Sequence, residues 1–117
     1  MKLRIQGNSL RLRVTQKEVL QLCDTKRVQS SIELMPGCSL SYALERSHHV
    51  KTITAGFDGS LVRVTVPANP ALDWAGSDQV TIEGRSPAGA QLLIEKDFQC
   101  LHKPAERDLD AFPNPLA

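Results

Sequence analysis

The sequence predicts an α+β fold, mainly antiparallel, with about eight strands and two short helices. Three observations carry this prediction. Apolar and polar side chains alternate in eight short segments of the 117-residue chain, as half-buried strands require. Turn residues join these segments in pairs, which is typical of hairpins. Two stretches with helical spacing of apolar residues separate the hairpins.

The first predicted element is a hairpin of strands 2–5 and 9–15 that turns at Gly7-Asn8. This register places four basic side chains on one face, in pairs of like charge, which weakens a sheet. They therefore need counter-charges, from an anionic ligand such as nucleic acid or from the protein's own carboxylates. The cross-strand pairs are Arg4 with Arg11 and Lys2 with Arg13.

A short helix is predicted to follow the first hairpin. Thr15 can cap its N-terminus, and Glu18 three residues later completes a capping-box pattern. Val19, Leu22 and Cys23 then fall on one face at helical spacing, so this face is expected to pack on the sheet.

The second predicted hairpin joins strands 28–34 and 39–46 through the turn residues Pro36-Gly37. In both strands the apolar side chains share one face, which is expected to point inward. These side chains are Val28, Ile32 and Leu34 in the first strand, and Leu40, Tyr42 and Leu44 in the second.

The second half of the chain repeats this order of elements. Its predicted hairpins are 52–57 with 60–66, across Asp58-Gly59, and 79–84 with 90–98, around "RSPAG". The helix between them is "NPALDWAG", with Asn69 as its cap and Pro70 in its first position. Leu72, alone or with Trp74, is expected to pack inward, and Gly76 to end the helix.

A shift of 50 residues aligns the two halves and suggests an internal duplication of a ββαββ unit. The predicted repeats are 2–46 and 52–97, within one domain of residues 1–100. A barrel-like closure is favoured over an open sandwich, because closure removes exposed strand edges. Residues 101–117 are predicted to form an extended, acidic, proline-containing tail. The matched positions are Arg13-Val14-Thr15 with Arg63-Val64-Thr65, Leu22 with Leu72, Ile32-Glu33 with Ile82-Glu83, and Leu44-Glu45-Arg46 with Ile94-Glu95-Lys96.

Composition and charge indicate the expected cellular location and the classes of partner. A net charge of +1 gives no global electrostatic case for nucleic acid or for an anionic membrane. No apolar run approaches the roughly 20 residues of a membrane helix, and the N-terminus lacks the apolar core of a signal peptide. Three cysteines without a CxxC pair favour a reducing compartment, so the expected location is the cytoplasm.

Catalytic and metal-binding patterns are sparse. The sequence contains no GxSxG, HExxH, phosphate-loop or dinucleotide motif, which favours a non-enzymatic role without a cofactor. Cys100 and His102 are two residues apart and could both bind a metal ion. A metal- or thiol-dependent activity at this pair is therefore the alternative to a non-enzymatic role. A surface loop is the expected place for His48-His49.

Charged and aromatic side chains supply the remaining binding candidates. Carboxylates on the outer faces of the strands are expected to neutralise the basic side chains. Weak anion or nucleic-acid binding by the basic hairpin is a further alternative, disfavoured because none of the five aromatic residues sits beside these bases. Trp74 is either an interface residue or a core anchor of the second helix. The basic candidates are Arg4, Arg11, Arg13 and Arg63; the acidic ones are Glu33, Glu45, Glu83 and Glu95 on the strands and Asp108 and Asp110 in the tail, where Phe112 is a possible anchor.

Three phrases resemble a family of uncharacterised small bacterial proteins of about this length. They are "MKLRIQGNSLRLRVTQKEV", "WAGSDQVTIEG" and "LLIEKDFQCLHKPAERDLDAFPNPLA". The resemblance implies a bacterial cytoplasmic protein whose tail belongs to the folded unit, and it implies no catalytic residues. The sequence thus predicts a small binding or adaptor module, with an unknown protein or a second copy of the chain as its partner.

Overall fold

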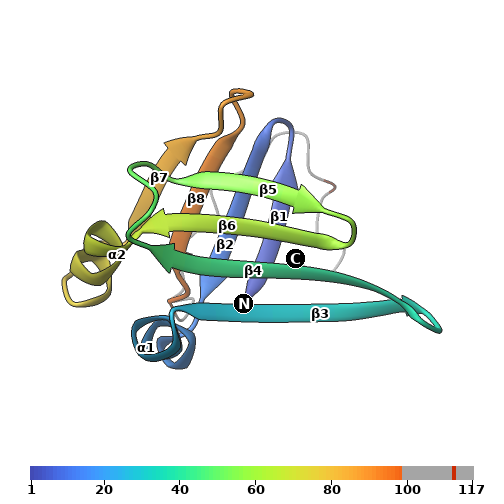
Figure 1. Cartoon of the computed structure of the whole chain (residues 1–117), viewed down its shortest axis with the longest axis horizontal. Coiled ribbons are helices and arrows are strands. Elements are labelled where there is room, and N and C mark those ends of the chain that lie inside the picture. Colours follow the sequence, from blue (N-terminus) through green and yellow to red (C-terminus); the bar gives the residue numbers. More distant parts are fainter. Residues whose placement is uncertain (99–111, 113–117) are drawn as a thin grey trace.

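The computed structural model describes residues 1–98 and residue 112, and it confirms the predicted α+β class with eight strands and two helices (Figure 1). The tail predicted for 101–117 lies outside the described residues except for Phe112. Neither helix in the described part of the chain has the length and hydropathy needed to cross a membrane. The elements are β1 (Lys2–Gln6), β2 (Ser9–Val14), α1 (Gln16–Thr25), β3 (Arg27–Met35), β4 (Cys38–Ser47), β5 (Thr54–Asp58), β6 (Leu61–Pro67), α2 (Ala68–Ala75), β7 (Thr81–Arg85) and β8 (Gln91–Lys96).

The strands form two four-stranded sheets. Sheet A has the order β1-β2-β8-β7, and sheet B has the order β3-β4-β6-β5. All four predicted hairpins are present and antiparallel, whereas the two central pairings, β2 with β8 and β4 with β6, are parallel. In Figure 1 the strands of sheet B cross steeply in front of those of sheet A.

The predicted barrel-like closure is wrong. The described strands form no closed barrel: they divide into two separate sheets of four, which agrees with the open sandwich that was the alternative. The described strands leave an edge on each side of each sheet, formed by β1 and β7 in sheet A and by β3 and β5 in sheet B. Two sheets form instead of a barrel because each hairpin pairs with one hairpin of the other half: β1–β2 with β7–β8, and β3–β4 with β5–β6.

The topology supports an internal duplication. Exchanging β1–β4 with β5–β8 turns the order of sheet A into that of sheet B, including the central parallel pair. The strand register corrects the uniform 50-residue shift. Leu12 in β2 pairs with Leu3 and Ile94. Val64 in β6 pairs in the same way with Ala55 and Leu44. Leu12 therefore corresponds to Val64, a shift of 52 residues. A shift of 50 residues holds for Leu44 and Ile94. Both shifts are even, so each side chain keeps its face.

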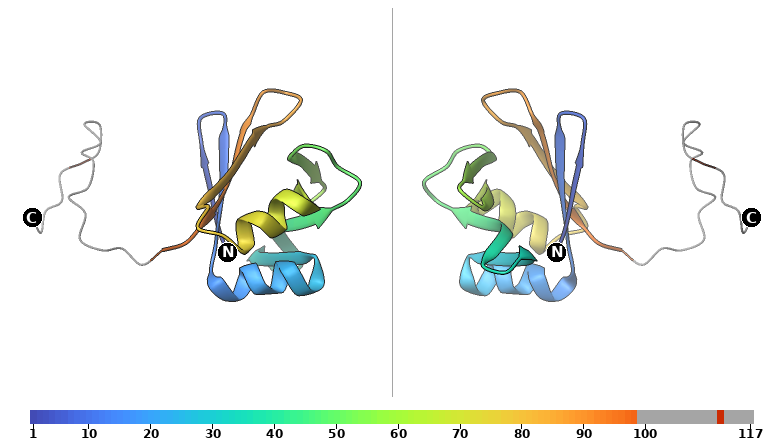
Figure 2. Two further views of the ribbon diagram at one scale, coloured as in Figure 1. Left: turned by 90° about the vertical axis from the view of Figure 1, so that its left-hand side faces the viewer. Right: turned by 90° about the vertical axis from the view of Figure 1, so that its right-hand side faces the viewer.

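The hydrophobic core lies between the two sheets and is closed at one end by the helices. Both helices lie on the same side of the molecule, and they contact each other (Figures 1 and 2). Tyr42 of sheet B crosses to sheet A, where its hydroxyl donates a hydrogen bond of 2.9 Å to the Met1 carbonyl. The fully buried side chains include Leu12, Leu22, Leu44, Val64, Trp74, Leu92 and Ile94.

Helix α1 begins with the predicted capping box. The Thr15 hydroxyl accepts from the Glu18 amide, and the Glu18 carboxylate accepts from the Thr15 amide. Partial burial raises the pKa of Glu18, but hydrogen bonds from the Met1 amino group and from Thr15, and the charge of that amino group, outweigh it, so the pKa lies below its usual value. Val19 and Leu22 are buried as predicted.

Helix α2 starts two residues earlier than predicted, at Ala68 instead of Pro70. It spans Ala68–Ala75, with Pro67 in the cap position and no capping side chain, so Asn69 and Pro70 lie inside its first turn. Trp74 is fully buried, whereas Leu72 is 41% exposed. The 50-residue shift matched the buried Leu22 with Leu72. The 52-residue shift matches Leu22 with Trp74 instead, and Trp74 is the residue that occupies the core.

Candidate functional site

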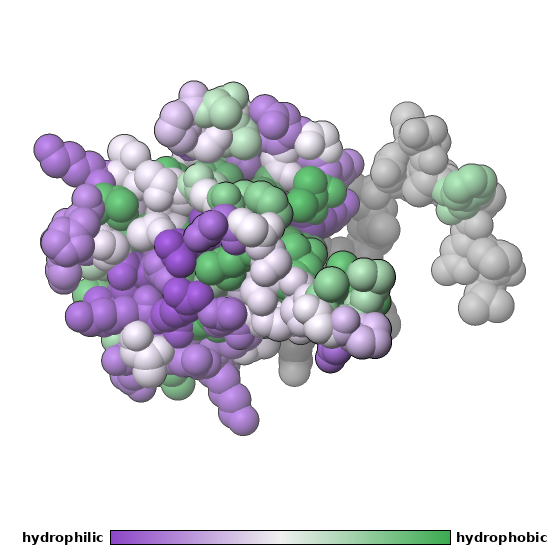
Figure 3. All heavy atoms as spheres, turned by 45° about the vertical axis from the view of Figure 1, so that its right-hand side comes forward, coloured by the Kyte–Doolittle hydropathy of each residue, from purple (hydrophilic) through white to green (hydrophobic). Residues whose placement is uncertain are grey.

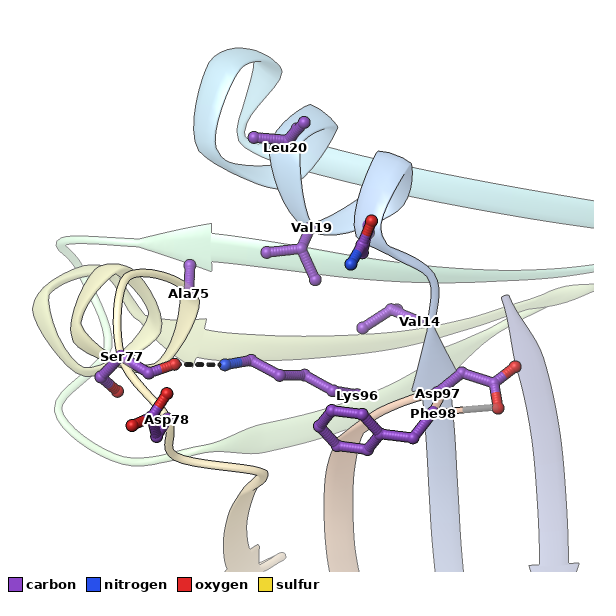
Figure 4. Close-up of a pocket in the computed structure, with 10 residues that line it drawn as sticks. Val14, Val19, Leu20, Ala75, Ser77, Asp78, Lys96, Asp97 and Phe98 are labelled. Atoms are coloured by element: carbon purple, nitrogen blue, oxygen red, sulfur yellow. Dashed lines mark hydrogen bonds between the residues drawn. The ribbon is translucent and has the colours of Figure 1, made fainter. Parts of the chain in front are cut away.

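A pocket of about 560 Å³ lies where α1, α2 and the end of β8 meet (Figure 4). Four segments that are distant in the sequence line it: the end of β2, the first turns of α1, the end of α2 with the residues that follow, and the end of β8. The lining residues are Val14, Gln16, Val19, Leu20, Ala75, Ser77, Asp78, Lys96, Asp97 and Phe98.

Lys96 is the basic group of the pocket. Its ammonium donates a 2.7 Å hydrogen bond to the Ser77 carbonyl, drawn in Figure 4, and lies 5.6 Å from the centre of the Trp74 ring. Both contacts orient the side chain along the pocket wall. Neither contact supplies a negative charge, and no carboxylate of the described residues lies within ion-pair distance. The ammonium therefore retains donors for a ligand.

The position of Lys96 follows from the duplication. Lys96 corresponds to Arg46 at the end of β4. Arg46 binds carbonyls in the last turn of α1, whereas Lys96 binds the carbonyl of Ser77, which follows the cap residue Gly76 of α2. The Arg46 guanidinium donates to the Leu22 carbonyl at 2.9 Å and to the Cys23 carbonyl at 2.6 Å. A cation in this place offsets the partial negative charge of the helix end.

Apolar side chains form the rest of the pocket wall. Val14 and Val19 are buried at its base, whereas Leu20 and Phe98 are about two-thirds exposed at its rim. In Figure 4 the Phe98 ring lies beside Lys96, on the opposite side of the pocket from α1. Large exposed apolar side chains around a hollow are a common feature of ligand-binding surfaces.

Two carboxylates border the pocket and differ in their partners. Asp97 forms an ion pair with Lys2 at 3.1 Å, so its charge is balanced within sheet A. Asp78 lies in the segment after α2, near Ser77 in Figure 4, and forms no ion pair with the described residues. The pocket therefore presents an apolar floor with one cation and one anion at the end formed by α2.

The predicted basic face of the first hairpin is present, and two carboxylates partly balance its four basic side chains. The register is as expected, with Arg4 opposite Arg11. Glu95 of β8 lies between two guanidiniums, 3.2 Å from Arg11 Nε and 3.4 Å from Arg13 Nε. The counter-charge of these two arginines is therefore a carboxylate of the protein itself, one of the two sources expected from the sequence. Arg4 contacts only the side chain of Gln6 among the described residues.

The same arrangement recurs in sheet B. Glu45 accepts from Arg27 and lies 3.6 Å from Arg63. Because Arg63 corresponds to Arg11 and Glu45 to Glu95, these two ion pairs are equivalent in the two halves. Arg27 and Arg13 are not equivalent, since Arg27 lies on the edge strand β3 and Arg13 on the central strand β2. Each such partly exposed pair contributes up to about 1 kcal/mol. The other two predicted acidic residues, Glu33 and Glu83, form no ion pair within the described part of the chain.

The remaining candidates are not gathered at the pocket. Trp74 lies in the core, where its indole N–H donates to the Val80 carbonyl at 2.9 Å. Phe112 is almost fully exposed. Four candidates, Cys100, His102, Asp108 and Asp110, lie outside the described residues. Within residues 1–98 and 112, no group of three or more His, Cys, Asp or Glu side chains could hold a metal ion.

Sequence reasoning missed the pocket and its lysine. The available signal was the match of Arg46 with Lys96, which marks two basic residues at equivalent strand ends. This match alone does not reveal a pocket, because the place of Lys96 relative to α1 depends on the pairing of β2 with β8, which the sequence did not predict.

Comparison with family models finds one match, described as a family of unknown function (DUF7009), over residues 1–116. The match confirms the resemblance to a family of unknown function that the three phrases indicated. The search of curated proteins gave no match, and neither did the search of solved structures.

Proposed function

This chain belongs to the DUF7009 family of unknown function, and we propose that it is a non-enzymatic binding module. The pocket between α1 and β8 receives a short segment of a partner protein. The preferred segment carries an apolar side chain next to a carboxylate. We place this activity in the bacterial cytoplasm, on the grounds of the family resemblance and the cysteine pattern of the sequence.

The observation that carries the proposal is the combination of an apolar pocket with the Lys96 ammonium. A volume of about 560 Å³ falls within the range of ligand pockets in proteins. The exposed rim residues Leu20 and Phe98 favour an apolar group that enters between them. Their burial on binding would contribute about 25 cal/mol for each Å² removed from water.

Lys96 determines the polar part of the expected ligand. Its ammonium has three N–H donors, of which the Ser77 carbonyl takes one. A carboxylate of the ligand can accept from the others while the adjacent apolar group occupies the pocket floor. Asp78 limits this preference to a single negative charge, because a second one would approach the Asp78 carboxylate.

The basic hairpin is a weaker candidate for the binding surface. Arg11 and Arg13 already contact Glu95, and Lys2 already contacts Asp97. A phosphate backbone would have to displace these carboxylates or bind alongside them, with repulsion in both cases. We therefore assign the binding role to the pocket.

The test uses two small probes that differ by one charge, N-acetyl-L-phenylalanine and its neutral amide. We expect both to bind weakly, and the acid to bind about two- to fivefold more tightly, which is the ratio from an exposed ion pair of up to about 1 kcal/mol. The affinities are measured by NMR titration of the full chain. In Lys96→Met, which keeps the length of the side chain, the acid and the amide are expected to bind equally.

Two further variants serve as controls. Lys51→Met removes an exposed lysine that does not line the pocket, so the preference for the acid should persist. Ala75→Phe fills the pocket and should weaken both probes together. The proposal fails if neither probe binds at its solubility limit, or if Lys96→Met leaves the acid-to-amide ratio unchanged.

A further inference from the structure

The hairpin of β3 and β4 extends well beyond sheet A. In Figure 1 its tip reaches farther from the helices than any strand of sheet A. We call residues 31–39 the distal hairpin; every residue in this range is exposed. The inner side of the distal hairpin, which would face the core closer to the helices, is therefore not covered by the described part of the chain.

The distal hairpin exposes apolar side chains where its strand pattern predicts a buried face. Val28, on the same face of β3 as Ile32 and near the helices, is 2% exposed, whereas Ile32 is 52% exposed. Leu34, where the register with β4 shifts between Glu33 and Met35, is 65% exposed. Figure 3 brings this end of the molecule forward and shows hydrophobic surface interrupted by paler residues. An exposed apolar ridge on a projecting hairpin is typical of a surface that another protein covers.

β3 is also the longest of the four sheet edges. It has nine residues, whereas each of the other edge strands has five. Natural proteins protect edges with short strands and charged side chains. β3 carries charge only near its two ends, at Arg27 and Glu33, so the five residues from Val28 to Ile32 form an uncharged stretch of edge.

The charges at the two ends of β3 fit a second copy of the same strand. Glu33 is the only charged residue in the distal hairpin. At the other end, Glu45 lies between Arg27 and Arg63, which leaves a net positive charge. An antiparallel pairing of two copies directs the Glu33 end of each strand toward the Arg27 end of the other, so opposite charges approach.

We infer that the protein forms a symmetric homodimer through the β3 edges of two copies. The pairing joins two copies of sheet B into one continuous sheet and covers Ile32 and Leu34 on both sides of the interface. A two-fold axis satisfies this geometry, because an antiparallel edge is complementary to itself. The interface lies away from the pocket, so this inference does not depend on the proposed function.

The test measures molar mass by light scattering after size-exclusion chromatography of the full chain. Reducing buffer is used because Cys38 is exposed. We expect the chain of 12.9 kDa to elute with twice this mass at about 100 μM and to dissociate on dilution. Ile32→Lys and, separately, Leu34→Lys place a charge in the interface and should each yield a monomer with an unchanged circular dichroism spectrum.

The matched control is Ile5→Lys. Ile5 is also an exposed isoleucine on an edge strand, at 65% exposure, but it lies on β1. It should leave the dimer intact. A monomeric wild-type chain at about 500 μM would overturn the inference, whatever covers the β3 edge in that monomer. Equal dissociation by Ile5→Lys would also overturn it, because that result indicates non-specific apolar association.

In addition, hydrogen exchange of the unmodified chain gives an answer that does not depend on how any variant folds. The amides between Ser30 and Leu34 that point away from β4 should exchange more slowly at about 500 μM than at about 5 μM. Exchange that is independent of concentration while the mass is dimeric would place the interface elsewhere and contradict the inference.

Discussion

At the level of single residues, the two halves use the same chemistry with different side chains. Arg46 and Lys96 occupy equivalent strand ends; Arg46 binds carbonyls in the last turn of α1, and Lys96 binds a carbonyl just after α2. The guanidinium reaches two carbonyls, whereas the ammonium reaches one and keeps donors that face the pocket. We attribute the binding that we propose for the second half to this difference between arginine and lysine.

The first prediction concerns Arg46. Arg46→Met removes two charge-assisted hydrogen bonds and leaves the Leu22 and Cys23 carbonyls without these donors. We expect the free energy of unfolding to fall by about 2 kcal/mol, within the range for hydrogen bonds to charged groups. Urea denaturation measures it, with the exposed Lys51→Met as the control. A loss no larger than that of the control would show that Arg46 does not stabilise α1.

Some residue-level features were predictable because they depend on neighbours in the sequence. The capping box of Thr15 and Glu18 is one example, and the register of Arg4 with Arg11 across the Gly7-Asn8 turn is another. The pocket depends on contacts among segments separated by up to 84 residues, from Val14 to Phe98. Periodicity within a segment carries no information about such contacts.

At the level of elements, alternation predicted every strand and hairpin but not how the hairpins associate. Within a hairpin, the turn fixes both partner and register. The parallel pairings of β2 with β8 and of β4 with β6 join strands with no such turn between them. The same face pattern is compatible with a barrel and with two sheets, which is why the predicted closure was wrong.

Contact between the sheets also explains a glycine that the sequence did not single out. Gly84 of β7 faces Ile53, which is buried in the segment between β4 and β5. A Cβ atom at position 84 would lie 1.9 Å from Ile53 Cγ2. Only glycine therefore permits the present approach of this segment to sheet A.

The second prediction follows from this contact. Gly84→Ala should lower the free energy of unfolding by about 1–3 kcal/mol, as overpacking does in cores. The matched control is Gly56→Ala on the edge strand β5, where an added Cβ meets nothing within 4 Å. Thermal and urea unfolding of both variants provide the comparison. Equal stability of the two variants would contradict the close packing of Ile53 on Gly84.

At the level of the whole molecule, neither half forms a sheet of four strands by itself. The first half supplies β1–β2 to sheet A and β3–β4 to sheet B, and the second half completes both sheets. The core residues Leu12 and Ile94 are adjacent in sheet A although they come from different halves. We therefore expect stability to arise from the association of the halves.

The third prediction separates the halves. The chain is divided in the exposed segment after β4, giving residues 1–49 and 50–117. We expect neither fragment alone to give the dispersed NMR spectrum of a folded monomer, and an equimolar mixture to recover the spectrum of the intact chain. A folded, monomeric spectrum from either fragment alone would contradict the interdependence of the halves.

The central claim is that the pocket between α1 and β8 binds an apolar group. The most direct measurement is the methyl ¹H–¹³C spectrum of the full chain during titration with N-acetyl-L-phenylalanine. The account predicts saturable shifts for Val14, Val19 and Leu20, with the methyls of Ile32 and Leu34 unchanged. Shifts confined to Ile32 and Leu34, or no shifts up to the solubility limit of the probe, would contradict it.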